Sequence, residues 1–127
     1  MTLETLAQAF TVCKLRDPAG IDWTVPFCFV SHTDGELSLV CPTAAVPADT
    51  LAREDGWRAF RVAGSMAFSL VGVLAGLTGA LAARGIAVFA LSTFDTDYVL
   101  VKADRFAAAL EALAAEGHAI TAMGSPD

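Results

Sequence analysis

The stretch Gly85–Lys102, with the sequence GIAVFALSTFDTDYVLVK, decides the fold. Its two apolar runs, Ile86–Leu91 and Tyr98–Val101, are rich in Val, Phe, Tyr and Leu. Such runs on either side of a short polar segment predict the two strands of a β-hairpin. The polar segment holds two carboxylates and three hydroxyls, which is more than the closing of a turn requires. We therefore regard this turn as the first candidate for a binding site. Its polar residues are Ser92, Thr93, Asp95, Thr96 and Asp97.

A second copy of the pattern lies earlier in the chain, at Phe27–Cys41 (FCFVSHTDGELSLVC). A shift of 61 residues places Ser31 on Ser92 and Asp34 on Asp95. Each predicted hairpin is followed by a segment of helical length, a glycine and a short apolar run. An internal repeat of this kind predicts two related units of roughly sixty residues.

The remaining elements follow from apolar periodicity, glycines and helix caps. We expect strands at Phe10–Leu15, Trp57–Ala63 and His118–Thr121, a short helix at Pro47–Glu54 and a long helix from about Phe68 to Arg84. A last helix, with Asp104 as its N-cap, should run to Glu116. The second half then has the order β-α-β-β-α-β of a ferredoxin-like fold. The first half is abbreviated and lacks the first helix. The prediction is an α+β protein of two ferredoxin-like repeats, residues 1–60 and 61–127. The repeats intertwine as one compact unit, and helices cover one face of antiparallel sheet.

The composition limits the classes of partner. The eight Lys and Arg residues are scattered and the formal net charge is −6, which argues against nucleic-acid binding. Hydrophobic residues make up 55% of the chain and charged residues 17%, which is unusually apolar for a small protein. A large interface with a second copy would bury this surface, so a homodimer is expected.

The uncharged run Met66–Ala83 is long enough for a membrane span. It is built from Ala, Gly, Ser and Thr more than from Leu and Ile, and it has two faces. We therefore expect a helix packed within the protein and no membrane association. One face is a large apolar stripe, and the other is a stripe of small residues suited to close contact. The first holds Leu70, Val73, Leu77 and Leu81, and the second Ser69, Gly72, Gly76, Gly79 and Ala83.

The three cysteines lie inside apolar runs and form no CxxC pair. This pattern is typical of buried, reduced thiols in a cytoplasmic protein. The chain starts without the basic and apolar regions of a signal peptide, which favours the same location. No metal-ligand spacing, phosphate loop or nucleophile motif occurs, so no cofactor, no metal and no catalysis are expected. The cysteines are Cys13, Cys28 and Cys41.

The chain resembles the ACT-domain regulatory family, in particular the small tandem-ACT proteins related to the aspartate-kinase type and to the CASTOR amino-acid sensors. The resemblance runs from Phe10 to Ala122. It is carried by a strand, Gly-Ser before an apolar helix, the element STFDTDYVLV, and a helix that ends in Gly-His. The first-half segment DGELSLVCP fits the first ACT repeat of these proteins. The resemblance implies a non-catalytic regulatory module that binds a free amino acid at an interface between domains or subunits.

The resemblance also implies where the ligand binds. In the family, the loop before the first helix and the second strand with its turn frame the site. A zwitterionic amino acid needs an anion for its ammonium, which Asp95 and Asp97 can supply. It also needs N–H donors for its carboxylate, which the start of a helix offers. The expected ligand-binding residues are Gly64, Ser65, Met66, Phe68, Leu91, Ser92, Thr93, Asp95, Thr96 and Asp97.

Several alternatives stay open. Asp95 fits a turn residue that caps its own backbone, and Ser92 and Thr93 fit hairpin hydrogen bonds equally well. His32 and Asp34 fit ordinary turn residues or a second site in the first repeat. The main alternative function is a dimeric interaction scaffold with no ligand.

Overall fold

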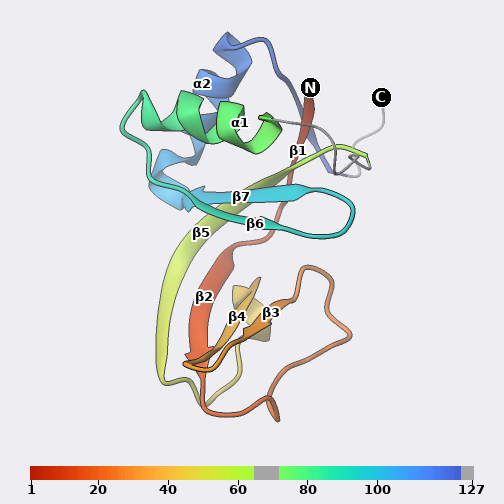
Figure 1. Ribbon diagram of the computed structural model, residues 1–127, viewed down its shortest axis with the longest axis vertical. Helices are drawn as coiled ribbons and strands as arrows, with labels where there is room; N and C mark the ends of the chain where they lie inside the picture. Colours follow the sequence, from red (N-terminus) through yellow and green to blue (C-terminus); the bar gives the residue numbers. More distant parts are fainter. Residues whose placement is uncertain (65–71, 124–127) are drawn as a thin grey trace. The chain divides into compact units, whose positions relative to one another are not determined.

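The computed structural model describes residues 1–64 and 72–123 (Figure 1). Its contacts divide the chain into two compact units. The discontinuous unit consists of Met1–Ala7 and Arg58–Asp127, and the inserted unit is Gln8–Trp57. The predicted boundary near residue 60 lies close to the junction at Trp57 and Arg58. The first seven residues, however, belong with the second half of the chain, which the sequence did not indicate.

The discontinuous unit has the predicted β-α-β-β-α-β order, with one additional strand. The additional strand, β1, pairs with β5 in the antiparallel direction and with β8 in the parallel direction. On the other side β5 pairs with β7, and β7 pairs with β6. The α+β prediction is therefore confirmed, but the pair of β1 and β8 is parallel. The elements are β1 (Thr2–Thr5), the second part of β5 (Ala52–Val62), α1 (Val73–Ala82), β6 (Phe89–Ser92), β7 (Asp97–Lys102), a 3-10 turn (Ala103–Arg105), α2 (Phe106–Ala115) and β8 (Ala119–Ala122).

The core of this unit lies between its strands and its two helices, which share one hydrophobic cluster. Leu81 of α1 and Leu113 of α2 are fully buried against Phe60, Val99 and Leu3 of the strands. Truncating one such leucine to alanine typically costs about 2–5 kcal/mol of unfolding free energy. The predicted apolar stripe of the long helix thus faces the core over its described part.

The ends of the two helices differ in part from the prediction. The predicted start of the long helix, Phe68–Val71, lies outside the described residues, and the described helix α1 begins after Gly72. The predicted N-cap of α2 was Asp104, but Arg105 holds that position without a side-chain hydrogen bond. Asp104 lies in the preceding 3-10 turn, which leads directly into the helix. Over the described ranges, the model contains no helix with the length and apolarity of a membrane span.

The small-residue stripe of α1 meets no close neighbour at Gly76 or Gly79 among residues 1–64 and 72–123. A Cβ atom built at Gly76 or at Gly79 finds no atom within 4 Å outside the backbone of its own helix. The close contact that the sequence suggested for this stripe is therefore not made by the described part of the chain.

The inserted unit is built from strands alone. Its strands lie in the order β3-β4-β2-β5, and every pair is antiparallel. Its core gathers Cys13, Leu15, Ile21, Leu39 and Cys41. All of residues 8–57 are described, and they contain no α-helix. The elements are β2 (Phe10–Leu15), β3 (Phe29–His32), β4 (Leu37–Pro42), a 3-10 turn (Thr43–Ala45) and the first part of β5.

The predicted helix at Pro47–Glu54 is wrong. β5 begins at Ala52, which pairs with Lys14 of β2, and Arg53 pairs with Cys13. The N–H of Leu51 also donates to the carbonyl of Lys14 at 2.8 Å. Pairing with this segment satisfies the backbone groups along the free edge of β2, a requirement that outweighs local helix propensity.

The two hairpins form as predicted, but they correspond at a shift of 60 residues and not 61. In the β3–β4 hairpin the N–H of Thr33 donates to the carbonyl of Glu36 at 2.9 Å. In the β6–β7 hairpin Thr93 and Thr96 make the same bond at 2.9 Å. The one-residue error matters because neighbouring strand residues point to opposite faces of a sheet. The predicted matches of Ser31 with Ser92 and Asp34 with Asp95 are therefore wrong.

Candidate functional site

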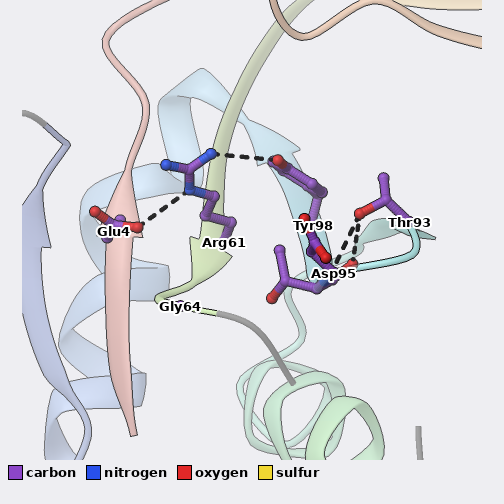
Figure 2. A pocket seen from close by; sticks show the side chains of 7 residues that line it. Glu4, Arg61, Gly64, Thr93, Asp95 and Tyr98 are labelled. Atoms are coloured by element: carbon purple, nitrogen blue, oxygen red, sulfur yellow. Dashed lines mark hydrogen bonds and ion pairs between the residues drawn. The ribbon is translucent and has the colours of Figure 1, made fainter. Parts of the chain in front are cut away.

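A pocket of about 250 Å³ lies in the discontinuous unit, where the β6–β7 turn approaches the end of β5 (Figure 2). We call it the Arg61 pocket. Strand β1 contributes one residue, β5 and its end contribute two, and the hairpin contributes four. Ligand pockets commonly measure about 300–1,000 Å³, so this one suits a ligand of amino-acid size. Its lining residues are Glu4, Arg61, Gly64, Thr93, Asp95, Thr96 and Tyr98.

Arg61 lies between two partners on neighbouring strands, as Figure 2 shows. Its Nε donates to Oε1 of Glu4 at 3.1 Å, and its Nη1 donates to the hydroxyl oxygen of Tyr98 at 3.3 Å. The hydrogen bond to Tyr98 and then the one to Glu4 raise the pKa of Arg61 above its ordinary value. The guanidinium is therefore a permanent cation, and the carboxylate of Glu4 compensates its charge.

The two threonines of the turn hold its backbone. The Oγ1 of Thr93 donates to the carbonyl of Thr96 at 3.1 Å and accepts from the N–H of Thr96 at 3.4 Å. The hydroxyl of Thr96 is buried and donates to the carbonyl of Val62 at 2.8 Å, which ties the turn to β5. Both hydroxyls thus position the pocket wall.

Asp95 differs from the other charged groups of the pocket. It lies at the exposed tip of the turn and lines the pocket. Across residues 1–64 and 72–123, its carboxylate makes no hydrogen bond or ion pair. Because Glu4 and Arg61 neutralise each other, Asp95 gives the pocket a net negative charge. The arrangement suits a cationic group such as an ammonium.

The structure gathers only part of the predicted site. Gly64, Thr93, Asp95 and Thr96 line the pocket, and Gly64 has a φ of 75° at the end of β5. Ser65, Met66 and Phe68 lie outside the described residues.

Three predicted residues lie on the hairpin without lining the pocket. The hydroxyl of Ser92 donates to the carboxylate of Asp97, so these two side chains bind each other. Leu91 is half-buried on β6, opposite Tyr98. Ser92 thus makes a hydrogen bond within the hairpin, which was the alternative to ligand binding at this position, and its partner is Asp97.

Three residues of the pocket were missed by sequence reasoning: Glu4, Arg61 and Tyr98. Arg61 carried a signal, because it is a cation between the apolar residues Phe60 and Val62 of a predicted strand. A charge placed there is normally held by a partner. The position of Glu4 carried no signal, since β1 was not predicted.

The family model described as ACT domain matches residues 52–115. The cytosolic arginine sensor for mTORC1 subunit 1 is 29% identical over 119 residues in the rat, Rattus norvegicus, and 30% identical in the mouse, Mus musculus. The match covers 87% of this chain but 36% of each sensor, so the chain spans about a third of the length of these curated relatives.

Solved structures with the same fold include a protein of Agrobacterium tumefaciens, with 29% identity and a TM-score of 0.85. That match covers 99% of this chain and 96% of the other. The aspartate kinase of Clostridium acetobutylicum matches with a TM-score of 0.63 and 12% identity, over 87% of this chain and 33% of the kinase. The kinase likeness supports the fold alone.

Proposed function

The chain belongs to the ACT domain family, and from this premise we propose that it is a non-catalytic regulatory protein that binds a free amino acid in the Arg61 pocket. The observation that carries the proposal is the carboxylate of Asp95, which has no partner in the described part of the chain and lines a pocket of amino-acid size. The arginine-sensing activity in the name of the relatives supports this class of ligand.

In the proposed complex, the ligand's ammonium binds Asp95. Glu4 and Arg61 set the shape and charge of the opposite wall. The proposed partner of the ligand's carboxylate is the loop that begins at Gly64, as the sequence suggested, and the other predicted residues of this loop lie outside the described ones. A bound zwitterion would compensate the net negative charge of the pocket with its ammonium and keep its carboxylate away from Asp95.

We further propose that the protein is a cytoplasmic homodimer and that the amino acid binds at an interface between domains or subunits. The exposed small-residue stripe of α1 and the high apolar content support this assembly. The alternative is a dimeric scaffold without a ligand, and binding measurements separate the two.

The test is a thermal-shift screen of the common amino acids, followed by calorimetry with the amino acid that stabilises the protein most. A ligand that binds the folded state raises the melting temperature by mass action. Asp95→Ala should then cost about 2–5 kcal/mol of binding free energy, because the ligand's ammonium is left without a counter-charge.

Two variants control this experiment. Asp97→Ala should cost less, because Asp97 binds Ser92 and does not line the pocket. Asp34→Ala removes an exposed turn carboxylate from the other hairpin and should leave binding in the Arg61 pocket unchanged. If no amino acid stabilises the protein, or if Asp95→Ala binds as tightly as wild type, the scaffold is the better interpretation.

A further inference from the structure

We propose that the inserted unit holds a second small-molecule site, which binds a zwitterion between Lys14 and Glu36. The site is a pocket of about 280 Å³, here called the Lys14 pocket. It lies wholly within residues 8–57, so it does not depend on the Arg61 pocket. Its charged and polar lining residues are Lys14, Glu36, Ser38, Arg53 and Glu54.

The Lys14 pocket occupies the equivalent place on the other hairpin. At the shift of 60 residues, Glu36 corresponds to Thr96 and Ser38 corresponds to Tyr98, and all four residues line pockets. The strand next to the hairpin supplies a cation in both cases, Lys14 from β2 and Arg61 from β5. The same backbone arrangement therefore produces a hollow of similar size twice, with different side chains around it.

The charges of the two pockets are arranged differently. In the Arg61 pocket the cation is compensated by Glu4. In the Lys14 pocket neither the ammonium of Lys14 nor the carboxylate of Glu36 makes a hydrogen bond or ion pair with any described residue. Arg53 does not compensate the charge of Glu36, because it binds Asp55 at 2.8 Å.

The register of β2 and β4 places the two uncompensated residues, Lys14 and Glu36, diagonally across the strands. Lys14 lies directly opposite Ser38 across β2 and β4, and Glu36 lies two residues before Ser38. Residues in such a diagonal relation are about 7–8 Å apart at their backbones, within reach of long side chains. If the two exposed side chains paired with each other, the ion pair would contribute only about 0–1 kcal/mol. Pairing between them would therefore compete little with a ligand.

These features select a class of ligand. A zwitterion places its carboxylate on Lys14 and its ammonium on Glu36, so both charges gain a partner. A simple anion would face Glu36, and a simple cation would face Lys14. The pocket therefore suits an amino acid with an uncharged side chain, whereas the net negative Arg61 pocket also accommodates a ligand with an additional positive charge.

The experiment is a titration of the ¹⁵N-labelled full chain with each uncharged common L-amino acid, followed by NMR. At least one should shift the amide resonances of Lys14, Ser38 and Ala52. The amino acid with the largest effect is then compared with its analogues that lack the ammonium or the carboxylate. Both analogues should bind at least about tenfold more weakly, because each leaves one charge without a partner.

Variants of both pockets make the result specific. Lys14→Met and Glu36→Gln should each abolish these shifts while the spectrum stays that of a folded protein, since both side chains are exposed. Arg84→Met and Glu111→Gln remove exposed charges elsewhere and should change nothing. Asp95→Ala should leave the shifts of Lys14, Ser38 and Ala52 intact and remove only the shifts around Thr93. Absence of binding in one pocket is therefore distinguished from absence of binding in the other. The proposal is overturned if no uncharged amino acid shifts the three resonances, or if the shifts survive in Lys14→Met.

Discussion

The carboxylate of Glu4 lies 3.1 Å from Nε of Arg61, although 57 residues separate the two in the chain. The residues face each other in register across β1 and β5. Their side chains are 24% and 26% exposed, so water and salt screen the pair less than a pair on the open surface. One wall of the Arg61 pocket is therefore set by the strand that begins the described chain.

The Glu4–Arg61 pair should contribute measurably to stability. Arg61→Met leaves the carboxylate of Glu4 partly buried without its partner, and we expect a loss of about 1–2 kcal/mol, between the values for exposed and buried pairs. Glu4→Gln should cost less, because an amide can still accept a hydrogen bond from Arg61. Urea unfolding of both single variants and the double variant gives the coupling energy. Strictly additive losses would show that the pair contributes nothing.

Thr11 should be a second sensitive position, this time in the inserted unit. Its hydroxyl is fully buried, donates to Oδ1 of Asp55 at 2.6 Å and lies 2.9 Å from the hydroxyl of Thr43. Thr11→Val keeps the volume but removes both hydrogen bonds, which should cost about 1–3 kcal/mol of unfolding free energy. Thr11→Ser keeps both bonds and loses a methyl group, so it should cost less. Unfolding curves in which the serine variant is the less stable of the two would contradict this role.

Gly76 should report on assembly. A Cβ atom at this position meets no atom of the described chain outside its own helix backbone, and Gly76 is exposed, so Gly76→Leu should leave the fold of one protomer intact. If the small-residue stripe is the dimer contact, overpacking it should cost about 1–3 kcal/mol of association free energy. Sedimentation velocity over a range of concentrations measures the change. Ala114→Leu, at an exposed position of the other helix, α2, is the control. A wild-type protein that sediments as a monomer at micromolar concentration, or equal dimerisation of both variants, would exclude this interface.

Alkaline pH should destabilise the protein through Cys41. Burial raises the pKa of its thiol from 9.0 to about 12, and the neighbouring Cys13 and Cys28 add to the effect. Below pH 9 both folded and unfolded chains keep the proton, so this thiol does not make stability depend on pH. Between pH 9 and 12 the unfolded chain loses the proton first, and stability falls with rising pH by up to about 1.4 kcal/mol per pH unit.

The measurement is the free energy of unfolding in urea from neutral to alkaline pH for wild type and Cys41→Ala. The variant should be less stable at neutral pH because it leaves a cavity, but its stability should fall less steeply above pH 9. All other titratable groups are the same in the two proteins. Parallel curves would mean that the Cys41 thiol is not held neutral by the fold.

Local patterns predicted most of the elements in the discontinuous unit. The hairpin around Thr93 and the two helices were found from alternation, helical periodicity and glycines at positive φ, such as Gly85 and Gly117. These signals act over a few residues, so one sequence is enough to detect them. The turn with Asp95 was singled out for the same reason, since its polar residues are adjacent in the chain.

The errors have a common cause in contacts between distant segments. The part of β5 from Ala52 to Glu54 is a strand because β2 needs a partner, and its own charged sequence does not indicate one. The hairpin shift was wrong by one residue because composition alone does not define which strand residues face the core. Arg61 and Tyr98 were missed because their contact depends on the pairing of strands from separate parts of the chain.

The inserted unit interrupts the discontinuous unit in the chain, and this affects the order in which the strands can pair during translation. The strands of the inserted unit have all been synthesised once residue 57 is made, and N-terminal segments generally fold first during synthesis, which adds about 5–20 residues per second. Strand β1 is made before them, its antiparallel partner β5 is complete at Val62, and its parallel partner β8 comes last, so one side of β1 stays unpaired for several seconds. Its shortness and the charge of Glu4 limit wrong pairing during that wait. Strand β1 is therefore fully paired only after β8 has been made.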